Sequence, residues 1–460
     1  MNNTVCSLMI TYGISVPVLA YIYLKFKNKA NSIITCRLII ITGMLLRILY
    51  IFYTNVYTRQ HDVEDFSLSD DGHAAYILYL LQNKHLPDFD PRNAWQFYHP
   101  PLHHIISAAF LSVIGKFNIP LDTVGYELLQ VLPCLYSVLF CILAYKSLKL
   151  LGIKDRPLCF ATAFVTFHPT LIMLSGSINN DMLAAVLSMS SIYFLIKWSL
   201  NKCMSDIILT ALSIGLGMEA KLNAALTAPA AAAVFLYVFI KNIKDFRRLI
   251  TQYIVFGFVC VPIGLFWSVR NYIKFGVPAN YVPKLSADSD QYIGTGILSR
   301  LLDFSPYQFS SPFMQWRGDG APYNEFNPIT ALWKTSAFDG NTYFENSVVL
   351  QSFCCMLLFC LIILSCYSAY LLIAVFIKRS PILPEHKLMT AVLSLTLFIN
   401  YIVFCADYPH VCTQNMRYCV PLIFTQAVLF GCDEHSKFKE TAIFIFCVSS
   451  LTVYTVLQFF

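Results

Sequence analysis

Two neighbouring carboxylates, Asp70 and Asp71, lie in a long polar gap between two apolar stretches of the chain. A carboxylate can take the proton of a hydroxyl or amine as that group attacks, and a second carboxylate can orient the first. We therefore take Asp70 and Asp71 as candidate catalytic residues. The pair also fits the start of a helix, where an aspartate caps the first free amides. Asp62, in the same gap, is a rival carboxylate.

The run His99-Pro100-Pro101-Leu102 follows in the same gap. Proline fixes the backbone and favours the first turn of a helix, so a helix is expected to begin near Leu102. Helix N-termini attract phosphate, which makes His99 a candidate phosphate-binding residue. The plain alternative is a junction between a loop and a helix.

Residues 61–104 hold six of the ten histidines, a concentration that raises the question of a metal site. Zinc accepts imidazole ligands, but no histidine spacing here matches a zinc signature. We expect no metal and no other cofactor, with a divalent cation as the weaker alternative and interfacial histidines as the simplest one.

The turn at residues 175–181, SGSINND, joins two apolar stretches. The side-chain amides of Asn179 and Asn180 are suited to hydrogen bonding with sugar hydroxyls. Asp181 is a natural cap for the helix that follows, so an ordinary turn is the alternative.

Arginines stand at the ends of two further apolar stretches, at Arg270 and Arg417, and Arg47 lies within another. The guanidinium fork suits phosphate better than an ammonium group does. Arg270 and Arg417 are therefore candidate phosphate contacts, although each alone also fits an anchor at a membrane boundary.

These groups stand in a strongly apolar chain of 460 residues, 57% hydrophobic and 13% charged. Soluble proteins carry about 25% charged residues, so the composition predicts an integral membrane protein. The net charge of +6 is small for this length and shows no nucleic-acid footprint.

The apolar stretches predict an all-α, polytopic fold with about twelve transmembrane helices, since a span needs about 20 apolar residues. The expected spans are residues 5–24, 33–54, 128–148, 157–174, 182–199, 205–220, 224–240, 249–269, 347–374, 388–405, 418–432 and 441–459.

The loops between these spans divide by charge. The short basic loops all fall on one side, which the positive-inside rule makes cytoplasmic. The opposite side receives residues 55–127, the large loop of residues 270–346, residues 406–418 and the turn at 175–181. Within residues 55–127, the stretches 73–84 and 102–117 have the pattern of helices lying along the interface. We read residues 1–460 as a single polytopic membrane domain.

Four of these motifs, in this order, resemble the GT-C superfamily of membrane glycosyltransferases. The nearest likeness is to the branch of dolichyl-phosphate-mannose protein mannosyltransferases and aminoarabinose transferases. Its Asp-Glu-x-His motif is matched by Asp70-Asp71-Gly72-His73, and its His-Pro-Pro-Leu motif by the run that begins at His99. Its Asn-Asp turn is similar to Asn180-Asp181, and its Arg-Tyr-x-x-Pro motif resembles Arg417-Tyr418-Cys419-Val420-Pro421. The likeness covers about residues 33–432.

The resemblance implies a glycosyltransferase that uses a polyprenyl-phosphate sugar donor at the non-cytoplasmic face, with inversion at the sugar carbon. It implies Asp70 as the base, and it adds His73 and Tyr418 to the substrate-binding candidates. The partners would be the lipid donor, the bilayer and a glycan, lipid or protein acceptor. The location would be the cell membrane in a bacterium, or the endoplasmic reticulum in a eukaryote.

Two departures from the family pattern stand out. Asp71 replaces the family's glutamate, and His103 and His104 stand where its mannosyltransferases often continue Gly-Lys. The soluble domain of the eukaryotic protein mannosyltransferases is also absent, so a protein acceptor is not implied. A transporter or flippase for a lipid-linked sugar fits the span count equally well, and a non-catalytic assembly subunit is a third class.

Overall fold

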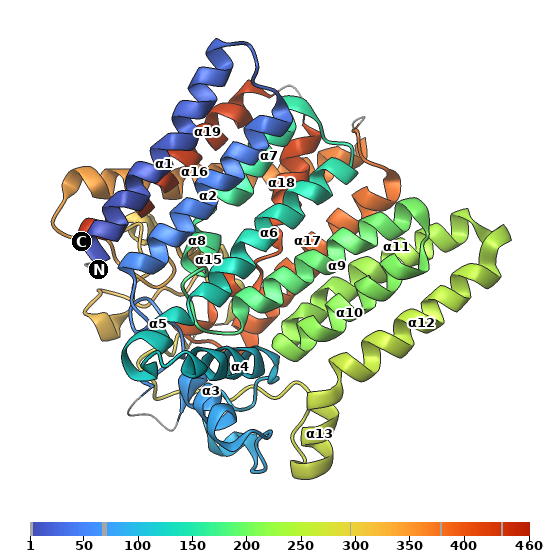
Figure 1. The fold of residues 1–460 in the computed structure, drawn as a ribbon, viewed down its shortest axis with the longest axis horizontal. Helices are drawn as coiled ribbons and strands as arrows, with labels where there is room; N and C mark the ends of the chain where they lie inside the picture. The colour runs from blue at the N-terminus through green and yellow to red at the C-terminus, as the bar shows by residue number, and fades with distance from the viewer. Residues whose placement is uncertain (1–2, 67–70, 295, 378–379, 434–435) are drawn as a thin grey trace.

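The regular structure of the chain is helical, in a computed structural model that describes residues 3–66, 71–294, 296–377, 380–433 and 436–460. Within these residues no strand forms, and one isolated antiparallel bridge joins Tyr292 and His410. The predicted all-α class is confirmed. Figure 1 shows the long helices running side by side, with both termini near one another.

Nine helical segments of the described chain are long and apolar enough to cross a bilayer. They contain α1 (Asn3–Phe26), α2 (Ser32–Tyr53), α6 (Val131–Leu150), α9 (Asp181–Asn201), α11 (Ala228–Lys241), α12 (Phe246–Gly264), α16 (Val348–Ile377), α17 (Pro384–Asp407) and α19 (Lys437–Val456). The three other expected spans are also helical but shorter: α7 (Asp155–Thr166) with α8 (Pro169–Met173), α10 (Met204–Ala220) and α18 (Leu422–Cys432).

The break between α7 and α8 explains the arginine inside the second span. α7 ends at Thr166 and α8 starts afresh at Pro169, so the carbonyl of Thr166 has no amide of a following helical turn and needs another donor. Arg47 supplies it at 3.0 Å and also donates to Ser137 Oγ at 2.7 Å. A Cβ at Gly43 would overlap the Thr166 methyl group, so α2 and α7 approach closely there. Arg47 is therefore a structural residue, which donates the hydrogen bond that the carbonyl at the end of α7 lacks.

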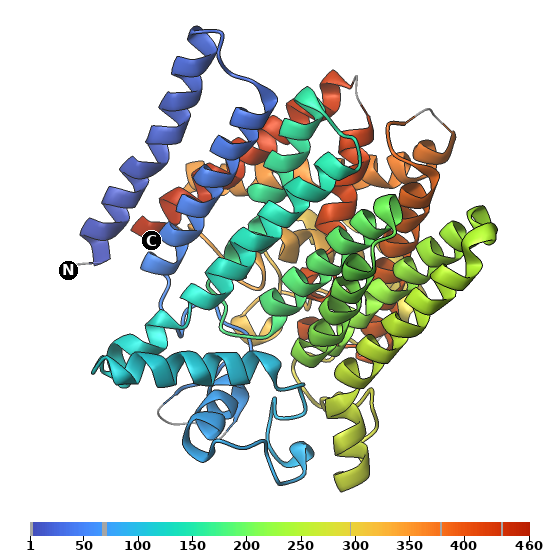
Figure 2. The same ribbon diagram turned by 45° about the vertical axis from the view of Figure 1, so that its right-hand side comes forward.

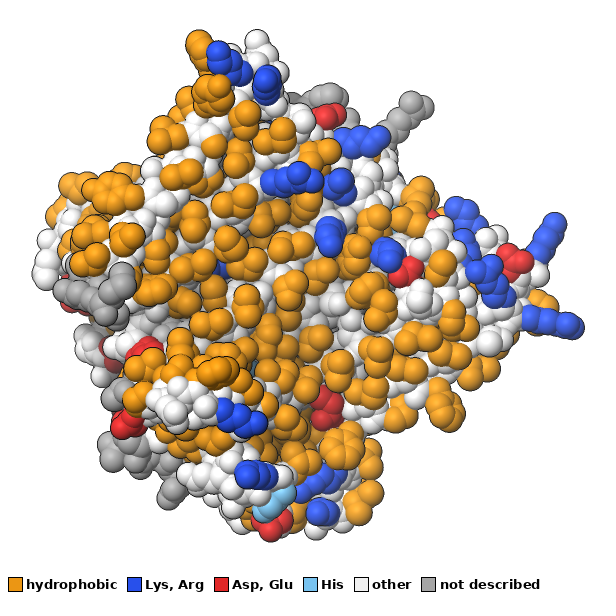
Figure 3. Space-filling model, viewed as in Figure 1, with side chains coloured by type: hydrophobic (Ala, Val, Ile, Leu, Met, Phe, Trp, Pro, Cys, Tyr) orange, Lys and Arg blue, Asp and Glu red, His pale blue; other side chains and the backbone are white. Residues whose placement is uncertain are grey.

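The two ends of the helical bundle differ. Figure 3 shows a broad apolar surface. Most of the visible Lys and Arg side chains lie towards the end of the bundle that carries the short basic loops. The other end carries α3 (Gly72–Asn83), α4 (Leu102–Lys116) and α13 (Phe266–Phe275). In both ribbon views α4 lies across the direction of the long helices (Figures 1 and 2).

The two short helices predicted in residues 55–127 are therefore present. Pro101 precedes the first residue of α4, Leu102, in helical geometry, as the His-Pro-Pro-Leu run predicts. α3 packs against α4 and begins directly after Asp71. The large loop of residues 270–346 contributes α14 (Ile297–Leu302) and α15 (Pro328–Phe338) at the same end of the bundle.

Candidate functional site

A cavity of about 330 Å³ opens at the end of the bundle that carries α3, α4 and α13. Its charged and hydrogen-bonding walls come from several separate parts of the chain, and apolar side chains complete it. The polar lining consists of Asp62, His73, Tyr98, His99, Asn180, Asp181, Lys221, Asn223, Ser268, Asn271, Asn280, Tyr281, Asn400, Arg417 and Tyr418. The cavity thus combines several of the motifs that are scattered in the sequence.

Asp62 is the most accessible carboxylate of the described lining, with 34% of its side chain exposed. Its backbone adopts φ 57°, and its carbonyl accepts a hydrogen bond from the first turn of α3, from the amide of His73 at 2.9 Å. Its Oδ2 lies 3.2 Å from Nη1 of Arg417. Burial is the largest single effect and alone would raise the pKa of Asp62, but the charge and hydrogen bond of Arg417, together with the nearby histidines His61 and His73, outweigh it and leave the pKa below its ordinary value.

Opposite charges alternate deeper in the cavity. Lys221, directly after α10, pairs with Oδ1 of Asp181 at the start of α9. Oδ2 of Asp181 faces Arg417 at 3.8 Å. Burial lowers the pKa of Lys221, against the raising effect of Asp181. The ring of Tyr418 lies between the two cations, with Lys221 Nζ at 4.9 Å and Arg417 Cζ at 5.0 Å from its centroid.

These charged groups are not fully satisfied within the protein. Nε of Arg417 and Oδ2 of Asp181, both on lining residues, are buried and have no hydrogen-bond partner, and the same is true of Nδ2 of Asn179 behind them. Buried polar groups are almost always paired in native structures, so unpaired ones next to a cavity point to a ligand. The geometry fits an anionic ligand held by Arg417 and Lys221 beside the carboxylate of Asp62.

Four histidines pack together beside this charge cluster. His73 stacks on His99 and His104, with ring centroids 5.6 and 5.1 Å apart, and its Nδ1 lies 2.8 Å from Nε2 of His104. Burial lowers the pKa of His73 to about 4 and that of His103 to about 3, so these rings are neutral at pH 7. Within the described ranges, no group of three or more His, Cys, Asp or Glu side chains is arranged to hold a metal ion.

The other predicted site residues lie in different places. Asp70 falls outside the described residues. Asp71 is exposed at the N-cap of α3, where its Oδ1 accepts a hydrogen bond from the amide of Trp95 at 2.7 Å, and it does not line the cavity. Asn180 lines the cavity and donates from Nδ2 to the carbonyl of Ala220. Asn179 lies behind it, and its Oδ1 accepts from the amide of Asp181 at 3.1 Å.

Arg270 lies in α13 beside the cavity but is not part of its lining. Its guanidinium donates to Oδ1 of Asn271 at 2.8 Å and to the carbonyl of Pro87, and it rests over the ring of Trp267. Of the two candidate phosphate arginines, Arg417 is therefore the one that reaches the cavity.

Sequence reasoning did not assign Lys221 or Tyr98 to the site. Lys221 carries a usable signal, because it is a charge in a short turn between two apolar stretches, where charge is costly unless it is paired. Tyr98 has no such signal beyond its position next to His99.

Comparison with known proteins agrees with this architecture. A search of curated proteins found no match to the chain. Residues 111–277, which run from α4 to the loop after α13 and include Asp181 and Lys221, match the family model of dolichyl-phosphate-mannose-protein mannosyltransferase. The family likeness is thus supported by a match over residues 111–277, which contains one of the four short motifs, Asn180-Asp181, and the chain is a multi-pass membrane protein that resembles the glycosyltransferases of the GT-C type.

Proposed function

We propose that the protein transfers a sugar from a polyprenyl-phosphate donor to an acceptor at the non-cytoplasmic face of the membrane. The observation that carries this proposal is the cavity in which an accessible carboxylate, Asp62, stands beside two cations, the buried Arg417 and the largely buried Lys221. A base next to an anion site is what transfer from a sugar phosphate requires.

The donor phosphate is assigned to the cations. Charge-assisted hydrogen bonds from Arg417 and Lys221 would stabilise the phosphate as it leaves with the bonding electrons of the broken sugar–oxygen bond. His99, neutral and at the cavity wall, can donate one further hydrogen bond to it. His73, Asn180 and Tyr418 offer polar groups for the sugar hydroxyls, and the apolar lining, including Leu226 and Phe404, suits the start of the lipid tail.

A single displacement accounts for the reaction. The acceptor attacks the sugar carbon from the face opposite the phosphate, its proton passes to a carboxylate, and the configuration inverts. Asp62 is the described carboxylate best placed for this role. Asp70 remains a predicted base from the family resemblance, with Asp71 as its predicted partner. No metal ion is part of the proposed reaction.

The proposed face follows from the charge of the loops. The cavity lies at the end of the bundle opposite the short basic loops, and these are cytoplasmic under the positive-inside rule. That end faces the lumen of the endoplasmic reticulum in a eukaryote, or the outside of the cell membrane in a bacterium. The acceptor can be a glycan, a lipid or a protein.

Transfer can be measured directly with the full chain in vesicles and a radiolabelled polyprenyl-phosphate mannose. We expect label to move from the lipid to an added glycan, lipid or peptide acceptor, and we expect this transfer to fail in Asp62→Asn. Asp303→Asn, a carboxylate of the same end that caps a turn through Ser305, is the matched control. If Asp70→Asn abolishes transfer and Asp62→Asn does not, Asp70 is the base.

Movement of labelled lipid across the vesicle membrane without transfer would instead support the transporter or flippase alternative. The position of the cavity at one end of the bundle favours transfer, because transporters place their sites near the middle of the membrane.

A further inference from the structure

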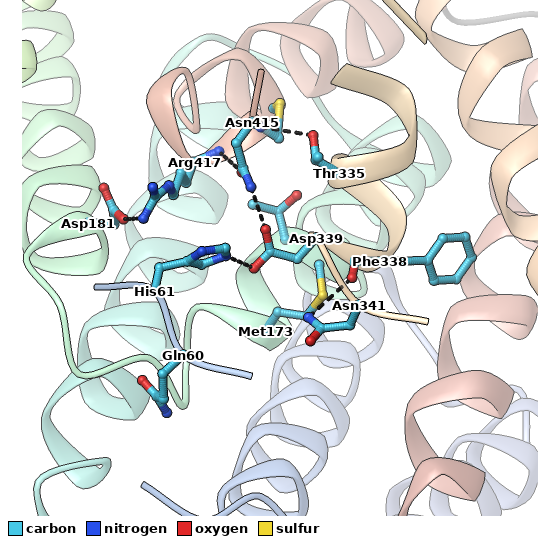
Figure 4. Close-up of polar contacts among 12 residues, drawn as sticks. Gln60, His61, Met173, Asp181, Thr335, Phe338, Asp339, Asn341, Asn415 and Arg417 are labelled. Carbon is cyan, nitrogen blue, oxygen red and sulfur yellow. Dashed lines mark hydrogen bonds and ion pairs between the residues drawn. The ribbon is translucent and has the colours of Figure 1, made fainter. Parts of the chain in front are cut away.

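Asp339 lies outside the cavity lining and accepts two short hydrogen bonds from segments far away in the sequence. It directly follows α15, with 10% of its side chain exposed. Its Oδ2 lies 2.5 Å from Nε2 of His61, and its Oδ1 accepts from Nδ2 of Asn415 at 2.5 Å. Figure 4 shows both side chains reaching the one carboxylate.

The two partners of Asp339 stand next to the two halves of the ion pair in the cavity. His61 immediately precedes Asp62, and Asn415 precedes Arg417 by two residues. Oδ1 of Asn415 also accepts from the amide of Arg417 at 2.9 Å, so Asn415 joins Asp339 directly to the arginine's backbone (Figure 4). One carboxylate therefore connects the segment that carries the base to the segment that carries the phosphate-binding cation.

Three further hydrogen bonds hold the same two segments. The amide of Met416 donates to Oγ1 of Thr335, one turn before Asp339 in α15, at 3.0 Å. Gln60, on the other segment, donates from Nε2 to the carbonyl of Gly176 and accepts from the amide of Ile178, both at 2.9 Å. The residues that precede Asp62 are thus held from two directions.

The backbone of the Asp62 segment needs such support. Arg59, Asp62 and Glu64 all have positive φ, at 59°, 57° and 60°. Side chains other than glycine adopt this region at a cost, and such a conformation persists only where the surroundings enforce it. Asp339 itself has φ 58°. Strained residues that cluster in one segment and are held by hydrogen bonds to their neighbours are typical of functional sites.

We propose that Asp339 is a positioning residue that sets the distance and angle between Asp62 and Arg417 through His61 and Asn415. The expected effect of Asp339 on transfer rests on the proposed function. Whether Asp339 holds the two segments in place can be tested without it. Burial alone would raise the pKa of Asp339, and the hydrogen bonds from His61 and Asn415, with the nearby positive charges, bring it below its ordinary value. Asp339 is therefore ionised at neutral pH.

The activity test compares two variants at the more exposed partner. His61→Gln keeps a hydrogen-bond donor towards Asp339, whereas His61→Leu removes it. We expect kcat to fall about 100-fold in His61→Leu and in Asp339→Asn, since a misplacement of about 1 Å costs that much. The KM for the donor should change little, the melting temperature should stay near that of the Asp303→Asn control, and His61→Gln should recover most of the loss.

The mechanical test uses hydrogen exchange measured by mass spectrometry on the same proteins. In Asp339→Asn, we expect faster exchange in two peptides at once, one around residues 56–66 and one around residues 411–420, with α9 unchanged. Unchanged exchange in either peptide would overturn the inference even if the wild type transferred no sugar. Normal kcat in both His61→Leu and Asp339→Asn, with transfer by the wild type, would overturn it while leaving the proposed function intact.

Discussion

Two charge networks at the same end of the bundle differ in how completely their polar atoms are paired. Around the cavity, Asp62, Asp181, Lys221 and Arg417 alternate in charge, yet three buried polar atoms in and behind this cluster have no hydrogen-bond partner. In the large loop of residues 270–346, Glu325 and Lys334 form a pair at 2.7 Å, with 0% and 1% of their side chains exposed.

The second network is closed. Oε1 of Glu325 accepts from Thr330, and its backbone carbonyl accepts from Gln414. The guanidinium of Arg300 donates to the carbonyl of Phe326 at 2.8 Å, to the carbonyl of Cys405 at 2.7 Å and to Oε1 of Gln414 at 2.8 Å. A charge cluster in which every buried polar atom has a hydrogen-bond partner fastens the loop to the neighbouring helices. A cluster whose polar atoms lack partners and border a cavity is suited to binding a ligand.

The largest effect is expected at the cavity carboxylate. Asp62→Asn keeps the size of the side chain but cannot accept the acceptor's proton, so transfer should fall by about 10²- to 10⁴-fold, the usual contribution of a general base. The melting temperature of the purified protein should change little. Wild-type transfer by Asp62→Asn would place the base elsewhere, with Asp70 as the next residue to test.

The closed network should respond in stability instead. Lys334→Met leaves Glu325 buried without its cation, which should lower the free energy of unfolding by about 3–5 kcal/mol. Adding Glu325→Gln should restore much of this stability, because no unpaired charge remains. Thermal melts of both variants measure the effect, and transfer per folded molecule should stay normal. A selective loss of transfer in the double variant would contradict the structural role.

A smaller effect on transfer is expected when the cavity arginine is exchanged for lysine. Arg417→Lys keeps the charge but loses the fork that reaches Asp62 and Tyr418 together. We expect a loss of about 10- to 100-fold in kcat/KM, below that of Asp62→Asn. Labelled donor in vesicles gives the rate, and Arg92→Lys, an exposed arginine paired with Asp90, is the control. Equal rates for Arg417→Lys and the wild type would remove Arg417 from the phosphate site.

The pH dependence of the free energy of unfolding should come from the groups beside the cavity, foremost the buried histidine His73. The pKa of His73 is about 4 in the folded protein and about 6.5 in an unfolded chain, so between these values only the unfolded chain binds the proton. Stability is therefore lost as pH falls from about 6.5 towards 4, by on the order of a few kcal/mol. Asp62 and Asp339 have lowered pKa values in the folded protein. Their contribution to stability is therefore lost only at lower pH, below about 3.9, where the unfolded chain begins to bind their protons.

Melting curves between pH 7 and 4.5 measure this dependence. His103→Leu removes a buried ring with no hydrogen-bond partner on either nitrogen, so its curve should fall less steeply. An identical slope in His103→Leu and the wild type would mean that His103 does not contribute.

The smallest effect is expected from chelators. Among the residues that the structure describes, neither network presents three or more potential metal ligands together. Treatment with EDTA should therefore leave both transfer and melting temperature unchanged. A loss that added manganese or magnesium reverses would show that the transfer site uses a metal ion.

The helical plan was predictable from the sequence. All twelve apolar stretches form helices, and the short helices α3 and α4 begin at Gly72 and Leu102, next to the carboxylate pair and the two prolines. These features depend on local properties, namely the length of an apolar run, the lack of an amide in proline and the charge of short loops.

The site was predictable only in part. His73, His99, Asn180, Asp181, Arg417 and Tyr418 do meet at the cavity, because their motifs lie in the loops and helix ends at one end of the bundle. Asn179 and Arg270 carry equally suitable groups but point to backbone and neighbouring side chains, and this depends on side-chain direction rather than position.

Only the tertiary structure decided which groups act on one another. The pair between Asp62 and Arg417 joins positions 355 residues apart, and the contact between His61 and Asp339 joins positions 278 apart. Such contacts depend on how the helices pack, and no local pattern encodes them. The sequence by itself determined a membrane bundle with polar motifs at one end, and packing determined that Asp62 and Lys221 complete the cavity and that Asp339 holds its two sides together.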